Sequence, residues 1–372
     1  MIVKLNEFQE SCRKILDSVD SNVLSVVSES LELESIGNTL LMNVTNKEYY
    51  VTVKTKLDVN SEEHLHTVVE ASLFLNLISK ITTNEVELYT EKENLVIKGN
   101  GTYKLPCIYE NDKLVELPKI TINNVTEEQT IDNNVLQDIL KYNAKELLKS
   151  GLKRGTQKLF YLDNNGCITK TLGACVTNFT LNTTSKLLLP EKLIKLFKLF
   201  KSDKVEFKLG YDECNKVLQQ KVYFSDDEVS ITAILLKDDN LLSSFPAEAI
   251  RKRAEDNYKY SVVVNKKDFL ESINRLSVFT KKDSYIVLSY IDFDNEKLTI
   301  FDTFKSNNES IKYVNSITDL DEGYEAIFDA TDLKLTLESC DEDFITIKFG
   351  NHKAVVIERN NVKNIIPECN KI

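Results

Sequence analysis

Lysine side chains recur at three-residue intervals in the stretch Leu187–Lys204. They stand at positions 192, 195, 198, 201 and 204, and leucine, isoleucine and phenylalanine residues lie between them. At about 100° per residue the apolar side chains form one stripe of a helix, and the lysines fan over the opposite half. Pro190 suits the first turn of such a helix. The stretch therefore predicts a helix over Pro190–Lys201 with one face for a protein core and one face suited to an anionic partner. On its own, this pattern is also typical of a solvated surface helix.

Residue types that carry catalysis or bind metals are sparse. The three histidines, at positions 64, 66 and 352, have no Cys, Asp or Glu cluster at zinc-ligand spacing beside them. Seven scattered cysteines without a CxxC pair indicate reduced thiols in a cytosolic protein. Lys98–Gly101 holds a lone Gly-x-Gly, which is more typical of a turn than of a phosphate loop. We therefore expect neither an enzyme nor a cofactor or metal site; an enzyme with an unrecognised acidic site is the alternative.

Length and composition limit the number and kind of domains that can carry these side chains. The chain has 372 residues, of which 42% are hydrophobic, and a formal net charge of −11. This is enough for two or three domains with sizeable cores. No run reaches the roughly 18 apolar residues of a membrane span. The first residues lead straight into a strand and a charged helix, so we expect no signal peptide, no membrane partner and a cytoplasmic location.

The elements that must position the lysines recur three times along the chain. Related helix openings begin near residues 2, 130 and 261, and related second helices near 68, 187 and 327. This period of roughly 125 residues is too long for a solenoid. Alternating segments such as Thr39–Lys54 predict strands and hairpins between the helices. The six expected helices are Glu7–Val19, Val68–Ile81, Val135–Lys149, Pro190–Lys201, Lys267–Phe279 and Thr331–Cys340.

These repeats predict an α+β fold of three domains, each with two helices packed on antiparallel sheet. The expected boundaries are 1–125, 126–252 and 253–372, with the polar residues 123–134 as a linker. Basic residues gather on the helices, as in Val135–Arg154 with five basic against two acidic side chains. The acidic remainder of the chain then predicts one basic surface on an otherwise acidic molecule. The first domain is the exception, because its opening helix offers only Arg13 and Lys14.

Two segments add a resemblance to a known family. The phrases KGNGTYKLPCI, from Lys98, and NKKDFLESINRLSVFTKKD, from Asn265, together with the threefold repeat, resemble the bacterial-type DNA sliding clamp, the beta subunit of the replicative DNA polymerase. The sequence is divergent, as in a clamp carried by a phage or mobile element. The resemblance implies three domains in a crescent and a homodimer that closes as a ring around double-stranded DNA. It implies a non-catalytic subunit whose partners are the replicative polymerase, the clamp loader and other proteins with a clamp-binding motif.

The resemblance also assigns residues to three surfaces. The helices that line the hole would face DNA with Arg13, Lys14, Lys80, Lys141, Lys145, Lys149, Lys192, Lys195, Lys198, Lys201, Lys266, Lys267 and Lys334. The subunit interface would join Tyr103, Leu105 and Ile108 of one copy to Val278 and Phe279 of the other. The partner-peptide pocket would be lined by Ala174, Val176, Thr177, Phe179, Pro246, Ile250, Ile366 and Pro367.

The pocket segments depart from the family pattern. The usual Thr-Asp-Gly-His-Arg-Leu run is replaced by Ala174–Phe179, and the usual C-terminal Met-Pro-Met-Arg-Leu by Ile366–Ile372. We expect the pocket to stay apolar, and the departures leave open whether it accepts the family's standard clamp-binding peptides. An interaction hub of the same shape that is not loaded on DNA remains the alternative function.

Overall fold

The structure is a computed structural model of the chain, and two compact units make it up. One unit contains Met1–Asn134 and Leu196–Lys237, and the other contains Val135–Lys195 and Asp238–Ile372. The residues that the structure describes are 1–19, 25–57, 64–147, 159–214, 217–235, 239–279, 285–292, 297–302, 304–318, 325–351 and 353–369.

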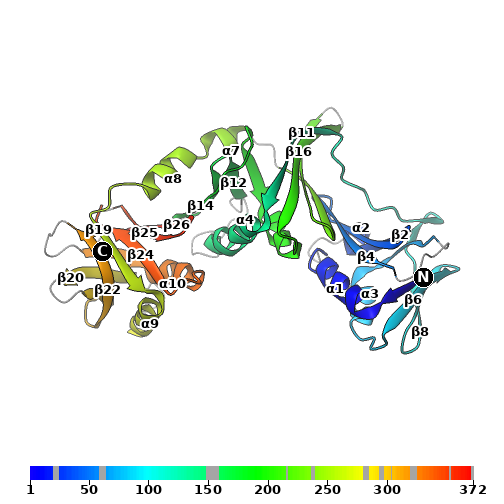
Figure 1. The fold of residues 1–372 in the computed structure, drawn as a ribbon, viewed down its shortest axis with the longest axis horizontal. Helices are drawn as coiled ribbons and strands as arrows, with labels where there is room; N and C mark the ends of the chain where they lie inside the picture. Colours follow the sequence, from blue (N-terminus) through cyan, green and yellow to red (C-terminus); the bar gives the residue numbers. More distant parts are fainter. Residues whose placement is uncertain are drawn as a thin grey trace. The chain divides into compact units, whose positions relative to one another are not determined.

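The first unit consists of two main antiparallel sheets and the helices packed on them (Figure 1). Its helical segments are α1 (Leu5–Leu16), α2 (Val26–Glu29), α3 (Ala71–Ile78) and the 3-10 turn η3 (Phe197–Leu199). Its strands are β1 (Ile2–Lys4), β2 (Ser30–Ile36), β3 (Thr39–Thr45), β4 (Tyr49–Lys56), β5 (His66–Glu70), β6 (Glu85–Glu91), β7 (Asn94–Lys98), β8 (Thr102–Pro106), β9 (Tyr109–Glu110), β10 (Lys113–Leu114), β11 (Asn124–Asp132), β16 (Lys204–Cys214), β17 (Val217–Ser225) and β18 (Val229–Ile234). The sheet orders are β1-β6-β7-β8 and β11-β16-β17-β18-β4-β3-β2-β5, with β9 and β10 as a separate pair.

The second unit is built on one sheet of twelve strands, β15-β12-β13-β14-β26-β25-β24-β19-β22-β21-β20-β23. The strands are β12 (Leu159–Asp163), β13 (Gly166–Lys170), β14 (Ala174–Asn178), β15 (Leu187–Pro190), β19 (Tyr260–Asn265), β20 (Tyr285–Asp292), β21 (Lys297–Asp302), β22 (Asn308–Thr318), β23 (Glu325–Asp329), β24 (Phe344–Phe349), β25 (Ala354–Arg359) and β26 (Val362–Pro367). The helical segments are the π-turn η1 (Ile139–Asn143), α5 (Ala144–Glu146), α7 (Asp239–Ser244), α8 (Ala247–Ala254), α9 (Lys266–Leu276), the 3-10 turn η4 (Ser277–Phe279) and α10 (Ala330–Glu338). The chain passes between the units within α4 (Asn133–Asp138), within α6 (Glu191–Leu196) and again between Lys237 and Asp238.

The order of elements repeats three times, starting at β1, β11 and β19. Each repeat has the order strand, helix, four strands, helix and three strands. Extra helices or a small hairpin are added to this order. Strands β4, β14 and β22 take equivalent places, and so do β8, β18 and β26. Consecutive repeats are joined by equivalent antiparallel ladders, β18 on β4 and β26 on β14. The α+β class and the threefold repeat predicted from the sequence are therefore confirmed.

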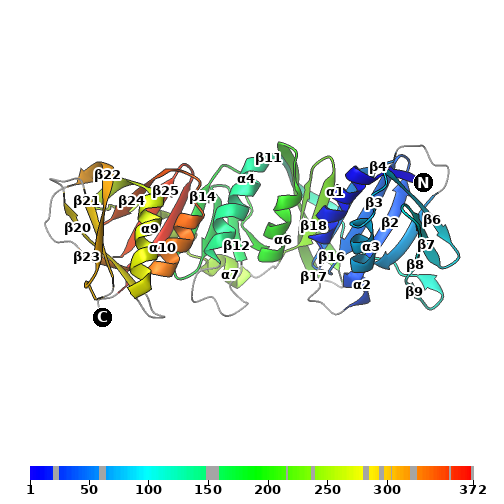
Figure 2. The same cartoon turned by 90° about the horizontal axis from the view of Figure 1, so that it is seen from below.

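Paired helices cover the sheets in both units. In the first unit α1 and α3 lie side by side, and the rings of Phe8 and Phe74 meet edge to face with centroids 6.0 Å apart. In the second unit α9 and α10 do the same (Figure 2), with Phe269, Leu333 and Leu337 fully buried. Such apolar stripes are what the helical spacing in the sequence predicts.

Three predicted segments differ from the structure. The polar stretch 123–134 is not a linker, because Asn124–Asp132 forms β11 and pairs along β16. Its side chains are mostly exposed, so its composition is that of a solvated edge strand. Helix Val68–Ile81 starts only at Ala71, because the residues before it pair with β2. The lysine helix ends at Leu196 and continues only as a 3-10 turn.

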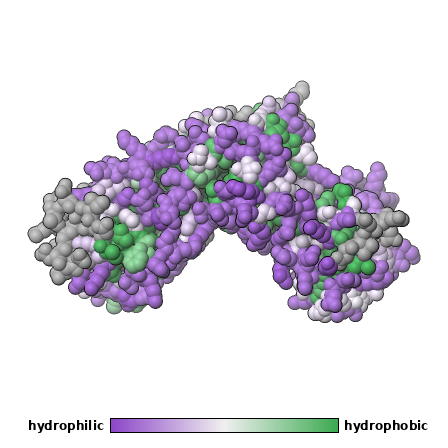
Figure 3. Space-filling model, viewed as in Figure 1, coloured by the Kyte–Doolittle hydropathy of each residue, from purple (hydrophilic) through white to green (hydrophobic). Residues whose placement is uncertain are grey.

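Polar residues dominate one face of the molecule (Figure 3). Figure 3 shows hydrophilic residues over most of one face, with hydrophobic residues in separate patches. In the described part of the chain, every helix is too short or too polar to cross a membrane.

Candidate functional site

The predicted lysine face is present on α6 and η3. Lys192, Lys195 and Lys198 are exposed, whereas Leu193 and Phe197 are buried. Carboxylates lie beside two of the lysines: Lys195 Nζ is 2.6 Å from Glu191 Oε1, and Lys198 Nζ is 3.0 Å from Asp17 Oδ2. Exposed pairs of this kind are weak and open readily, so the lysines can exchange a carboxylate for a phosphate. Lys201, which is also exposed, follows the end of η3.

Replacing Lys192, Lys195 and Lys198 with alanine is expected to flatten the salt dependence of binding to a short linear duplex. Each lost phosphate contact lowers the slope of log affinity against log salt by about 0.9, so the triple variant loses at most about three. Fluorescence anisotropy from low to moderate salt measures this slope. Lys14→Met is a matched control, because Lys14 is buried and should leave the slope unchanged. An unchanged slope in the triple variant would place these lysines away from DNA.

The other predicted cations in the second unit are held mainly by acidic neighbours and by backbone. Lys141 pairs with Asp341, Lys145 Nζ donates to the Glu338 carbonyl at 3.1 Å, and Lys266 Nζ donates to the Cys340 carbonyl at 2.9 Å. Lys267 and Lys334 each lie 3.9 Å from a glutamate one turn along their own helix. Lys149 lies outside the described residues. These cations stay predictions as DNA contacts.

One of the first-unit side chains that were predicted to face DNA is buried instead. Arg13 and Lys80 are exposed, but Lys14 is buried and pairs with Glu228 on the turn before β18. Its Nζ also lies 3.8 Å from Glu10. A buried, paired ammonium is not available to a phosphate, so the DNA-facing role predicted for Lys14 is wrong. Lys14 instead links α1 of the first repeat to the second repeat.

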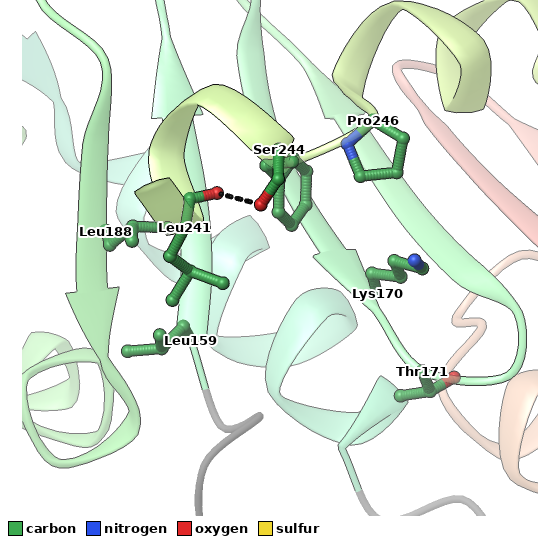
Figure 4. Close-up of a pocket in the computed structure, with 8 residues that line it drawn as sticks. Leu159, Lys170, Thr171, Leu188, Leu241, Ser244 and Pro246 are labelled. Atoms are coloured by element: carbon green, nitrogen blue, oxygen red, sulfur yellow. Dashed lines mark hydrogen bonds between the residues drawn. The ribbon is translucent and has the colours of Figure 1, made fainter. Parts of the chain in front are cut away.

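A pocket opens beside α7 in the second unit (Figure 4). It encloses about 190 Å³ and is lined by Leu159, Lys170, Thr171, Leu188, Leu241, Ser244, Phe245 and Pro246. An apolar cavity of about 150 Å³ holds a benzene molecule, so this one can take a leucine or a phenylalanine side chain. The walls come from β12, β15, α7 and the segment between α7 and α8, with the end of β13 at the rim.

The predicted pocket residues lie around this cavity, but only Pro246 lines it. Ala174, Val176 and Ile250 belong to the apolar cluster on which α8 packs. Thr177 is fully buried, and its hydroxyl donates to Asn143 Oδ1 at 2.7 Å. Ile366 lies in the core around α9 and α10. Phe179 and Pro367 are half-buried and outside the lining. Pro246 is therefore the one predicted pocket residue that this cavity shares, and the docking role of the other seven stays a prediction.

Beneath the pocket, a buried ion pair fixes α8 to the β12–β13 turn. Arg251 Nη1 and Nη2 donate to the two carboxylate oxygens of Asp163 at 2.8 and 2.7 Å. The Phe245 ring stacks on Tyr161 with centroids 4.5 Å apart. Burial and then the nearby Asp163 carboxylate raise the pKa of Tyr161 to about 12, so its hydroxyl stays neutral. The aromatic pair of Phe245 and Tyr161 therefore carries no charge.

The predicted interface residues divide between exposed and buried. Val278 and Phe279, at the end of η4, are 79% and 59% exposed. Arg275, one turn before them, bonds both oxygens of Glu309 on β22, which lowers the pKa of Glu309. On β8 and just after it, Tyr103 and Ile108 are half-buried. Leu105, on β8, is buried against its own sheet, and its interface role stays a prediction.

Groups suited to metal binding or nucleophilic chemistry do not gather in the described residues. No set of three or more His, Cys, Asp or Glu side chains there is placed to hold a metal ion. His66 Nε2 lies 3.1 Å from buried Glu32, and His64 Nδ1 lies 2.8 Å from the Ser35 carbonyl. Burial raises the pKa of the Cys12, Cys167 and Cys340 thiols, which disfavours the reactive thiolate.

No family model matches the sequence, and no curated protein matches it in sequence. Solved structures do match over the whole chain. The DNA polymerase sliding clamp of Bacillus subtilis aligns with 15% identity and a TM-score of 0.78, covering 100% of this chain and 99% of that one. The DNA polymerase beta subunit of Streptococcus pyogenes aligns with 14% identity and a TM-score of 0.79, covering 99% of each chain. The chain has the sliding-clamp fold. The DNA polymerase III beta subunit of Thermotoga maritima matches it similarly, with 13% identity, a TM-score of 0.77 and coverage of 99% and 98%.

On this sliding-clamp fold, the cavity and the predicted pocket residues use different parts of the chain between β13 and β14. The rim is formed by Lys170 at the end of β13 and by Thr171 just after it, whereas the predicted residues begin at Ala174. A Cβ on Gly173 would stand 2.2 Å from the Ile365 carbonyl oxygen, so the turn between β13 and β14 can pack against β26 only with glycine there. Gly173 is the third residue of Thr171-Leu172-Gly173, which matches the Thr-x-Gly at the start of the family run. This match could have been used to align the segment with the family run.

Proposed function

We propose that this chain is a DNA sliding clamp that encircles duplex DNA without sequence specificity and tethers the replicative polymerase and other partners. The full-length likeness to solved clamps supports this proposal most directly. In this reading the three repeats are domains 1–125, 126–252 and 253–372, and the chain is a non-catalytic subunit. A lysine-faced helix that meets phosphates loosely positions the protein without reading bases. Retention on DNA then depends on the closed ring rather than on tight contacts.

The strand ladders between repeats support closure into a ring. Strand β4 receives β18 from the following repeat, and β14 receives β26 in the same way. Within the described residues, the two equivalent edges left over are β8 and the first half of β22. Strand β8 ends its sheet, and Asn308–Lys312 of β22 pair only with β21. Exposed edges of this kind invite strand pairing.

A second copy can supply both missing strands. Strand β8 of one copy would pair with Asn308–Lys312 of the other, repeating the ladder already used twice inside the chain. This contact is head to tail, and it closes when two copies bring six repeats into one ring. The exposed Val278 and Phe279 follow Arg275 in the chain, and Arg275 bonds Glu309 on this part of β22. The homodimer is therefore part of the proposal.

The pocket beside α7 completes the proposal as the docking site for partner peptides, including those of the polymerase and the clamp loader. Its apolar walls and its volume suit one bulky side chain of an extended segment.

Retention on circular DNA tests the function. Protein loaded on a nicked circular plasmid is expected to stay bound through gel filtration at moderate salt and to leave after a restriction enzyme linearises the plasmid. A cognate clamp loader, or spontaneous ring opening at high protein concentration, supplies the loading step. Equal loss from circle and linear molecule would favour an interaction hub that is not loaded on DNA.

A further inference from the structure

The pocket beside α7 has an electrostatic character of its own. Its lining contains five apolar side chains, two hydroxyls and one charged group, Lys170. Three other clefts in the described residues each have at least one carboxylate in their walls, such as Glu228 or Glu87. In a chain with 58 acidic and 47 basic residues, this lining differs from those three clefts because it carries a cation and no acid.

The polar groups around the pocket are already hydrogen-bonded, apart from Lys170. Thr171 Oγ1 donates to Glu146 Oε1 at 2.8 Å, and Ser244 Oγ donates to the Leu241 carbonyl at 3.2 Å. Arg251 nearby is held by Asp163 and lies 3.9 Å from Glu248. Lys170 is the lining side chain left free for polar recognition.

Lys170 itself is exposed at the end of β13, and Figure 4 places its side chain on the pocket side, near Pro246. In the part of the chain that the structure describes, its ammonium makes no ion pair or hydrogen bond. Many other lysines of this chain, such as Lys198 and Lys363, have a carboxylate within 4 Å. The next residue but one, Leu172, is 71% exposed and extends the apolar surface beyond the cavity.

We infer that this pocket selects partner segments in which an acidic side chain accompanies the apolar anchor, with the carboxylate meeting Lys170. The inference rests on the proposed docking function of the pocket and names the charge of its ligand. The apolar side chain fills the cavity, a second apolar residue covers Leu172, and Asp or Glu pairs with the ammonium at the rim. Rim charges of this kind mainly set selectivity between partners.

Two fluorescent peptides test the inference by anisotropy at low salt. Both carry adjacent leucine and phenylalanine residues and differ only in an Asp or an Asn just before them. With an exposed pair contributing about 0.2–1 kcal/mol, the Asp peptide should bind up to about fivefold more tightly to the wild type. The preference should vanish in Lys170→Ala and reverse in Lys170→Glu. Lys267→Ala, at an exposed site on α9, should keep it.

The outcomes of this experiment distinguish the charge selection by Lys170 from the docking function of the pocket. Equal binding of the two peptides to the wild type, or an unchanged preference in Lys170→Glu, would overturn the charge selection and leave the docking pocket standing. Binding of neither peptide at high micromolar protein would overturn the docking function itself, and the inference with it.

Discussion

Replacing Val278 and Phe279 with aspartate is expected to convert the proposed dimer into a monomer. Both side chains are exposed, and they follow Arg275, which bonds Glu309 in the part of β22 that pairs only with β21. Anchors at the centre of an interface contribute about 2 kcal/mol or more each. Loss of both should weaken association by about a thousandfold. Sedimentation velocity at micromolar concentration measures the change in mass.

A matched control uses another exposed aromatic residue on the same unit. Phe344 is 53% exposed and pairs with Asn265, the residue that caps the start of α9, whereas Phe279 follows its end. With a rise of about 1.5 Å per residue, these sites are on the order of 18 Å apart. Phe344→Asp should therefore leave the dimer intact. A dimeric V278D/F279D variant with native circular dichroism would contradict the interface that we propose.

Much of the architecture could be predicted from the sequence because it depends on local periodicity. The stripes of α1, α9 and α10 follow the 3.6-residue spacing, and their threefold recurrence gave the number of repeats. Boundaries were less accurate where tertiary pairing decides. Val68 and Val69 sit in a helical pattern but are strand residues, because β2 offers them a partner.

The candidate sites were harder to predict because their geometry depends on distant partners. Lys14 looks like a surface cation on α1, but the carboxylate that neutralises it, Glu228, lies 214 residues away. The pocket depends on α7 and α8, which the sequence analysis did not predict, and on the turn before β14. Val278 and Phe279 stand at the end of an apolar helix pattern in the sequence, which is also typical of core residues. The structure shows that both side chains are exposed.

Replacing Arg251 with methionine should produce the largest loss of stability among single changes near the pocket. The side chains of Arg251 and Asp163 are 16% and 9% exposed, and their bidentate pair ties α8 to the β12–β13 hairpin. Removing one partner of a buried pair leaves the other charge without compensation, at a cost of about 3–5 kcal/mol. Thermal unfolding by circular dichroism should show a melting transition lowered by several degrees, and peptide binding should weaken with it.

The double variant R251M/D163N separates the uncompensated charge from simple loss of packing. Asn at position 163 keeps the side-chain oxygen that accepts the Asn165 N–H at 2.9 Å, so the turn between β12 and β13 retains its hydrogen bond. It removes the charge that Arg251 no longer balances. Because neutral replacement of a buried pair is often tolerated, the double variant should melt well above R251M alone. If both melt at the same temperature, α8 is held by its apolar face on Ile250 and Ala254, and the ion pair adds little.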